Sequence, residues 1–173
     1  MNKKNIIIYL AIIGSAVLTR LVPHAWNFAP VTAIAIFAAI YLPKKQAFAL
    51  PLAARFLSDL VIGFFGLQMM IAVYLSHLFG VVMGLWVRKN KNAARVLAAP
   101  VISAVVFFLV TNFAFLYSSY PHTWEGIVLA YTNGLPFLRG TLLGDLFYTV
   151  ALVGSYELVR KFSETTLQNP SQI

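Results

Sequence analysis

Charged and polar side chains that could do chemistry lie inside stretches of this sequence that are otherwise apolar. Arg55 and Asp59 are four residues apart, a spacing that places both on one face of a helix. His77 and Asp145 lie in two further apolar stretches. Groups of these types can form buried ion pairs, exchange protons or hydrogen-bond a polar ligand. Which of these they do depends on the elements that carry them.

The composition excludes an ordinary soluble domain. The chain has 173 residues, of which 60% are hydrophobic and 10% charged, whereas soluble domains are about 45–50% apolar and about 25% charged. Cysteine is absent, which excludes disulfides and thiolate metal sites, and we expect no metal and no cofactor. The net charge of +8 is better explained by membrane topology than by nucleic-acid binding. The expected partner is therefore the lipid bilayer.

Six apolar runs divide the chain, most of them near the length of about 20 residues that crosses a bilayer. They cover residues 4–22, 29–42, 46–64, 68–87, 96–118 and 136–159. The second run is short, so it is either tilted little or shielded partly by protein. The sequence "TWEGIVLAY", residues 123–131, is too polar to span and predicts a short interfacial helix before the sixth span.

We therefore predict an all-α, polytopic membrane protein with six transmembrane helices. Its single membrane domain covers residues 1–162, and residues 163–173 form a polar, flexible tail. The first run could instead be a cleavable signal peptide, but the later apolar runs favour a retained helix.

The basic residues predict the orientation. With the N-terminus inside, ten of the thirteen Lys and Arg residues fall on the inner side: Lys3, Lys4, Lys44, Lys45, Arg88, Lys89, Lys91, Arg95, Arg160 and Lys161. Basic residues accumulate on the cytoplasmic side of membrane proteins. We expect a multi-pass protein of the bacterial cytoplasmic (inner) membrane with both termini in the cytoplasm.

Depth in the membrane suggests which charges pair. An unpaired charge at the bilayer centre costs about 2.5–3.5 kcal/mol on insertion scales. Counting about 1.5 Å per residue along each span, we expect Arg55 to pair with Asp145. Asp59 is expected to pair with Arg139 or Arg20. Such pairs could also do no more than tie helices together.

Two outer loops bring further polar and aromatic residues to the same side of the membrane. They are "PHAWNFAP", residues 23–30, and "YPHTWEG", residues 120–126. Together with the intramembrane polar groups they predict a pocket that opens outward and binds a small polar or amphipathic ligand. The expected ligand-binding residues are His24, Trp26, Asn27, Phe28, Asp59, His77, Asn112, Trp124, Arg139 and Asp145. Three arginines against two aspartates near this pocket lean toward a ligand with an anionic group.

Three stretches of the chain resemble a family of uncharacterised small bacterial integral membrane proteins. They are "RLVPHAWNFAPVTAIAIFAAIYLPKK", "LPLAARFLSDLVIGF" and "NGLPFLRGTLLGDLFYT". This resemblance implies common descent without a known activity. More distantly, the size, the six helices and the inside termini resemble the substrate-binding S component of energy-coupling-factor (ECF) vitamin transporters. That resemblance implies a ligand near the outer face, capped by the loop between the first two helices. It also implies an energising module, an ATPase with a transmembrane coupling subunit, as a partner.

The leading interpretation is a membrane-embedded protein that binds and takes up a small, vitamin-like organic molecule. One alternative is a structural or assembly protein whose polar residues only fix helix packing. Another is a membrane-embedded enzyme that uses His77 with Asp59 or Asp145 as acid and base, but no catalytic motif supports it. A secondary transporter with Asp59 or Asp145 as a proton site is a further alternative, although the six runs show no clear internal repeat.

Overall fold

A computed structural model describes residues 13–21, 27–113 and 116–168 of the chain, and within these ranges it is helical and contains no strand. The helical segment 13–21 precedes five helices. These are α2 (Val31–Tyr41), α3 (Lys44–Ile62), α4 (Leu67–Lys89), α5 (Ala93–Thr111) and α6 (Trp124–Gln168). The all-α prediction is confirmed, and four of these helices lie close to the predicted apolar runs.

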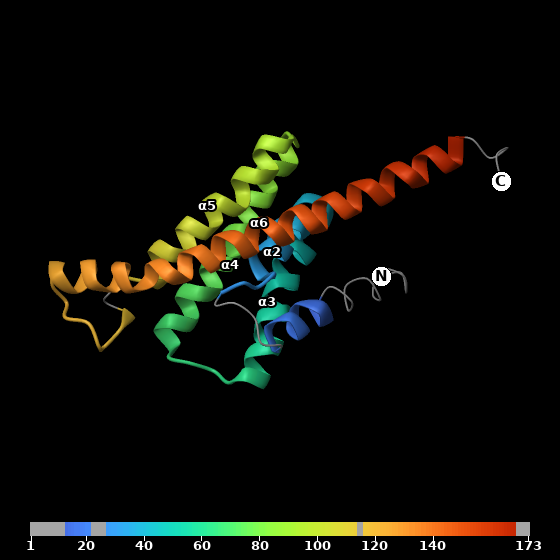
Figure 1. Ribbon diagram of the computed structural model, residues 1–173. Coiled ribbons are helices and arrows are strands. Elements are labelled where there is room, and N and C mark those ends of the chain that lie inside the picture. Colours follow the sequence, from blue (N-terminus) through green and yellow to red (C-terminus); the bar gives the residue numbers. More distant parts are fainter. Residues whose placement is uncertain (1–12, 22–26, 114–115, 169–173) are drawn as a thin grey trace.

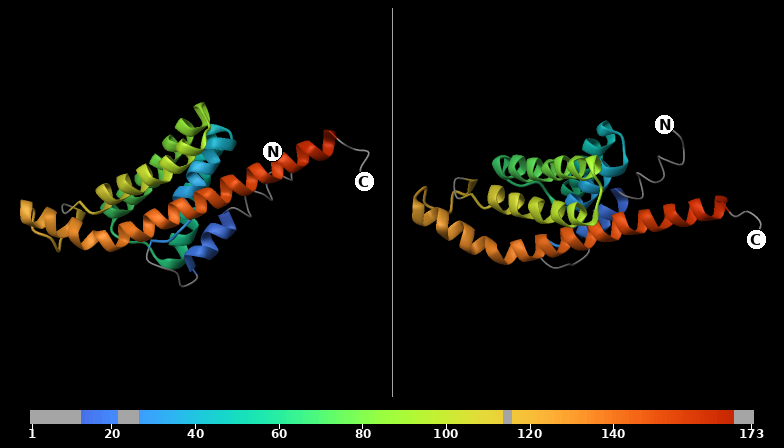
Figure 2. Two further views of the ribbon diagram at one scale, coloured as in Figure 1. Left: turned by 45° about the horizontal axis from the view of Figure 1, so that its top comes forward. Right: turned by 90° about the horizontal axis from the view of Figure 1, so that it is seen from above.

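Helix α2 is the centre of the bundle. It contacts α3, α4, α5 and α6, and every residue from Val31 to Ile40 is buried. In Figure 1, α6 crosses in front of α2 and α4. Figure 2 shows α6 curving along one side of the bundle and extending past the other helices at both ends. With 11 residues, α2 is about 16 Å long, and its burial confirms the shielding by protein that its short sequence run suggested.

The separate interfacial helix predicted before the last span is not present. Residues 124–168 form one helix of 45 residues that continues through Pro136. Proline removes one backbone hydrogen bond, which ends many helices, but packing can hold the two halves in line. The Tyr131 hydroxyl donates to the Leu109 carbonyl at 2.7 Å, and its ring packs against Phe108. These contacts with α5 support the turns before Pro136. The helix ends at Gln168, within the segment expected to be a flexible tail.

Three helices are long and apolar enough to cross a membrane: Leu67–Lys89, Ala93–Thr111 and Trp124–Glu164. Three, not six, therefore meet this criterion among the described residues. Helix α2 is too short, and the apolar run of α3 is interrupted by Arg55 and Asp59. Much of the first predicted span, residues 1–12, lies outside the described ranges. The three candidate spans indicate a membrane protein.

Two glycines let the backbones of α2 and α4 approach closely. A Cβ atom at Gly84 would lie 2.5 Å from the Ile36 carbonyl oxygen, and one at Gly80 would lie 3.1 Å from Cγ2 of Thr32. Small residues four apart are a common means of close helix packing in membranes. The alanines of α2, including Ala35 and Ala39, face the same contact. The central position of α2 therefore depends on these two glycines.

We predict that Gly84→Ala destabilises the protein by about 1–3 kcal/mol, because the new methyl group forces the two backbones apart. Gly154→Ala is the matched control, since a Cβ atom at Gly154 meets nothing within 4 Å. That change should be neutral or stabilise by about 0.5–1 kcal/mol, because alanine is the better helix former. Thermal unfolding in detergent measures both. Equal effects of the two substitutions would contradict the close packing.

Candidate functional site

The Asp59 carboxylate is buried and receives hydrogen bonds from three side chains. It is 1% exposed. Its Oδ1 atom lies 3.0 Å from Nη1 of Arg20, and its Oδ2 atom lies 2.8 Å from Nε of Arg55. The Tyr74 hydroxyl donates to Oδ2 at 3.0 Å. Asp59 therefore ties the segment 13–21, α3 and α4 together, and few of its lone pairs are left for a ligand.

The arrangement of ion pairs agrees only in part with the one expected from depth. Arg20, and not Arg139, is the distant partner of Asp59. Arg55 pairs with Asp59 rather than with Asp145, because a spacing of four residues on α3 already brings the two side chains into contact. Arg139 is exposed on α6. Asp145 has no ion pair within the described part of the chain and belongs to a different group of residues.

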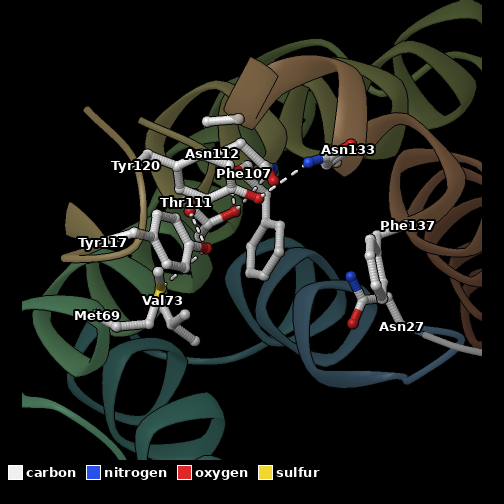
Figure 3. Close-up of a pocket in the computed structure, with 12 residues that line it drawn as sticks. Asn27, Met69, Val73, Phe107, Thr111, Asn112, Tyr117, Tyr120, Asn133 and Phe137 are labelled. Atoms are coloured by element: carbon white, nitrogen blue, oxygen red, sulfur yellow. Dashed lines mark hydrogen bonds between the residues drawn. The ribbon is translucent and has the colours of Figure 1, made fainter. Parts of the chain in front are cut away.

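A pocket of about 380 Å³ lies between α4, α5 and α6, and we call it the aromatic pocket (Figure 3). Its lining residues are Asn27, Met69, Val73, Phe107, Thr111, Asn112, Tyr117, Tyr120, Ala130, Asn133, Gly134 and Phe137. In Figure 3, Phe107 lies between Met69 and Val73 on one side and Asn27 and Phe137 on the other. The pocket is walled by aromatic rings and carries a few placed polar groups, as small-molecule sites do.

Hydrogen bonds fix the polar groups of the aromatic pocket. The Tyr117 hydroxyl donates to the Thr111 carbonyl at 2.6 Å, and Nδ2 of Asn133 donates to the Tyr120 hydroxyl at 3.2 Å. Nδ2 of Asn112 donates to the Phe108 carbonyl at 2.9 Å. Burial raises the pKa of the Tyr117 hydroxyl, and the neighbouring Tyr120 adds to the effect. The phenol therefore stays neutral and can donate at physiological pH.

A glycine on α6 allows the polar groups of α5 to meet α6. A Cβ atom at Gly134 would overlap the side-chain amide of Asn112, so a larger residue there would displace that amide. On the opposite wall, Asn27 has a φ of 58°. This left-handed conformation is one that asparagine tolerates better than most residues. It places Asn27 at the junction of the pocket with a second cavity.

That second cavity, which we call the polar cavity, has a volume of about 50 Å³. It is lined by Asn27, Ala29, Val31, Thr32, Arg55, His77, Phe107, Thr141 and Asp145. Asn27 and Phe107 line both spaces. The two cavities are therefore neighbours with a shared wall.

Thr32 links the two titratable groups of the polar cavity. Its Oγ1 atom lies 3.2 Å from Nδ1 of His77, and it lines the same cavity as the Asp145 carboxyl group. The His77 ring packs against Phe107, with the ring centroids 5.3 Å apart. His77 Nε2 and Asp145 Oδ2 are buried and have no hydrogen-bond partner in the structure.

The structure separates the ten residues expected to bind one ligand. Asn27 and Asn112 line the aromatic pocket, while His77 and Asp145 line the polar cavity. Asp59 is held by arginines. Four others lie elsewhere or cannot be placed: Phe28 packs against Phe147 and Tyr148, Trp124 is 73% exposed at the start of α6, and His24 and Trp26 lie outside the described residues. Arg139, the tenth, is exposed and lines neither cavity.

The sequence did carry a signal for several pocket residues that were not predicted. Met69 and Val73 on α4, and Phe107 and Thr111 on α5, are each four residues apart and line the same wall. Their types are common in lipid-facing and core positions, so the spacing alone did not mark them. Tyr117 and Tyr120 come from the connection between α5 and α6, whose path a sequence does not give.

A larger hollow of about 640 Å³ lies at the other end of α4. It is lined by Pro43, Lys44, Val82, Leu85, Trp86, Arg88 and Lys89. Its charged side chains are exposed cations, whereas Thr32, His77, Thr141 and Asp145 of the polar cavity are buried. The aromatic pocket and the polar cavity are therefore the better candidates for a specific site.

Comparison with known proteins shows the family. The family model described as a family of unknown function, DUF6580, matches residues 1–167. The chain belongs to this family. Neither the curated proteins nor the solved structures contain a match to the chain.

We predict that Asp59→Ala destabilises the protein by about 3–5 kcal/mol, because it leaves two largely buried arginines without their counter-charge. Glu164→Ala is the control. Glu164 lies 3.7 Å from Arg160 in an exposed pair, and such pairs contribute about 0–1 kcal/mol. Thermal unfolding in detergent compares them. A small effect of Asp59→Ala would mean that the three donors around it do not hold the helices together.

Proposed function

We propose that this DUF6580 protein binds a small, uncharged organic molecule at the outer side of a bacterial inner membrane and takes part in its uptake. The aromatic pocket is the observation that carries the proposal. Its volume of about 380 Å³ lies within the range of about 300–1,000 Å³ that is typical of small-molecule sites. Its rings suit a planar or apolar body, and its amides and hydroxyls suit hydrogen-bonding groups on that body.

The charges of the lining support a neutral ligand. No Lys, Arg, Asp or Glu is among the residues that line the aromatic pocket. Arg139, one of the three arginines that suggested an anionic ligand in the sequence, is exposed and lines neither cavity. An ionic ligand in this pocket would have no counter-charge there, and burial of an unpaired charge is costly. A vitamin-like molecule without a formal charge therefore fits best.

The proposed topology has six spans with both termini in the cytoplasm. The pocket lies at the ends of α4 and α5 marked by Met69 and Thr111, and the opposite ends carry Arg88, Lys89 and Arg95. The positive-inside rule puts those opposite ends in the cytoplasm and the pocket outside. Because α2 is enclosed by protein, its length need not match the bilayer.

In an arrangement like that of the ECF S components, a separate partner module would supply the energy for uptake. The sequence contains no Gly-rich phosphate loop, so a nucleotide-binding module would be a separate partner. The structural alternative fits the Asp59 network well, but that network lies apart from the lining of the aromatic pocket.

Native mass spectrometry of the protein purified gently from its host membranes tests the binding proposal. We predict a co-purified small molecule that is lost in Asn112→Ala and in Asn133→Ala, because both changes remove polar groups from the pocket wall. Trp124→Ala is the control, since Trp124 is outside the pocket, and it should keep the molecule. Unfolding temperatures of all three variants should stay near that of the wild type.

Two results would contradict this proposal. One is the absence of any bound molecule across several mild detergents. The other is a loss of the molecule in the pocket variants only where the protein also unfolds. Either result would favour a protein whose polar residues serve helix packing alone.

The lack of cysteine in the chain permits a direct topology test. We predict that Ser119→Cys reacts with a membrane-impermeant thiol reagent added outside intact cells. Asn90→Cys, at the basic end of α4, should react only after the membrane is opened. Both positions are exposed in the structure, so burial does not explain a difference. Equal labelling of the two positions in intact cells would rule out the proposed orientation.

A further inference from the structure

The two aspartates of the chain have opposite environments. Asp59 accepts hydrogen bonds from two arginines and a tyrosine. Asp145 is 2% exposed, and its Oδ2 atom has no hydrogen-bond partner. The nearest charged group known to share its cavity, Arg55, is paired with Asp59. Ionisable groups inside a membrane protein without a structural partner point to a functional site.

Thr32 lies beside both Asp145 and His77 in the lining of the polar cavity. A hydroxyl group has a single proton to donate. If this proton is turned toward the neighbouring Asp145 carboxylate, Oγ1 must accept from Nδ1–H of His77 at 3.2 Å. The proton of the neutral imidazole is then on Nδ1, and Nε2 is a bare acceptor. Within this group of three described residues, Nε2 of His77 and Oδ2 of Asp145 are buried and have no hydrogen-bond partner, and each can accept a proton.

We propose that Asp145, with Thr32 and His77, is a proton-binding site beneath the aromatic pocket. Proton uptake forms an O–H bond at Oδ2, neutralises the carboxylate and gives one of the two bare acceptors the proton that it lacks. The polar cavity of about 50 Å³ can hold water molecules, each of which needs at least about 10–15 Å³. Such water can carry a proton to the site.

The groups around the site come from four helices. Thr32 belongs to α2, Arg55 to α3 and His77 to α4, and Asp145 itself to α6. Arg55 is the one fixed charge in the lining. Outside the cavity, Asp59 is shared between Arg55 and Arg20, so this network keeps one net positive charge. Phe107 covers the site from α5. Arg55 and Asp145 do not form an ion pair, so gain or loss of the proton changes the net charge of the cavity.

The shared wall gives the proton its route. Phe107 and Asn27 line both the aromatic pocket and the polar cavity, and Phe107 lies against the His77 ring. Movement of this wall would connect the buried carboxyl group with the outside. A ligand that contacts Phe107 would then sense whether Asp145 is protonated. This coupling of the proton to uptake rests on the proposed function, whereas the proton site itself does not.

Infrared spectroscopy of isotope-labelled protein tests the site without any ligand. The chain has two aspartates, so cell-free synthesis with aspartate labelled with carbon-13 at the carboxyl carbon gives two signals. In phosphatidylcholine vesicles titrated between about pH 5 and about pH 9, we expect one signal to change from protonated acid to carboxylate. The titrating signal should be lost in Asp145→Asn.

Three variants test the role of Thr32 and of the shared wall: Thr32→Val, Phe107→Ala and Phe108→Ala. Loss of the Thr32 hydroxyl removes a polar group that lines the cavity with Asp145, so the midpoint of the titration should change. Phe107→Ala removes the shared wall and should speed deuterium exchange of the protonated Asp145 carboxyl. Phe108→Ala is the matched control, because Phe108 packs against Tyr131 instead, and it should leave that exchange unchanged.

The outcomes separate this proposal from the proposed function. Two aspartate signals that do not change with pH, or a titrating signal that survives in Asp145→Asn, overturn the proton site even if a molecule is bound in the aromatic pocket. An unchanged titration in Thr32→Val removes Thr32 from the site. Equal exchange in the two phenylalanine variants overturns the route. A titrating Asp145 in a protein that binds no small molecule keeps the proton site and ends the uptake proposal.

Discussion

An eleven-residue apolar helix is too short to cross a bilayer, and in this fold it is enclosed by protein instead. Helix α2 contacts all four of the other long elements, and Gly80 and Gly84 let α4 approach its backbone directly. Its first turn brings Thr32 to the polar cavity. Its last residue, Tyr41, hydrogen-bonds Glu157 on α6 at the basic end of the bundle. Helix α2 thus fixes α4 and α6 relative to each other both at the polar cavity and at the basic end of the bundle.

The charged groups follow from the same constraint. In a hydrocarbon environment, a charge needs a partner, a wet cavity or a change of protonation state. Asp59 has partners, because three side chains donate hydrogen bonds to its carboxylate. At the basic end of the bundle, Glu157 also has partners, because it forms ion pairs with Lys91 and Arg160. Among the described residues Asp145 has no ion-pair partner, and it lines a small cavity together with Thr32, Arg55, His77 and Thr141. Two residues of the same type are therefore suited to different tasks.

The division into two neighbouring spaces bears on any function of the protein. The aromatic pocket offers surface and hydrogen bonds without charge, which suits recognition of a neutral molecule. The polar cavity is too small for such a molecule but contains titratable groups, which suits a proton. Phe107 and Asn27 belong to both. A change at this wall is the shortest physical link between binding in one space and protonation in the other.

The sequence by itself determined the helical class, the approximate positions of four helices and the polar residues that interrupt their apolar runs, although α5 ends at Thr111, well before the end of its predicted run. Apolar runs and punctuation by proline and glycine encode these features locally. It did not determine that residues before and after Pro136 form one helix, because contacts of Tyr131 with α5 support that junction. Nor did it determine that Arg55 pairs with Asp59 and leaves Asp145 to Thr32 and His77. Residue depth along separate helices does not fix which faces meet, and only the packing of α2 against α4 and α6 decided that.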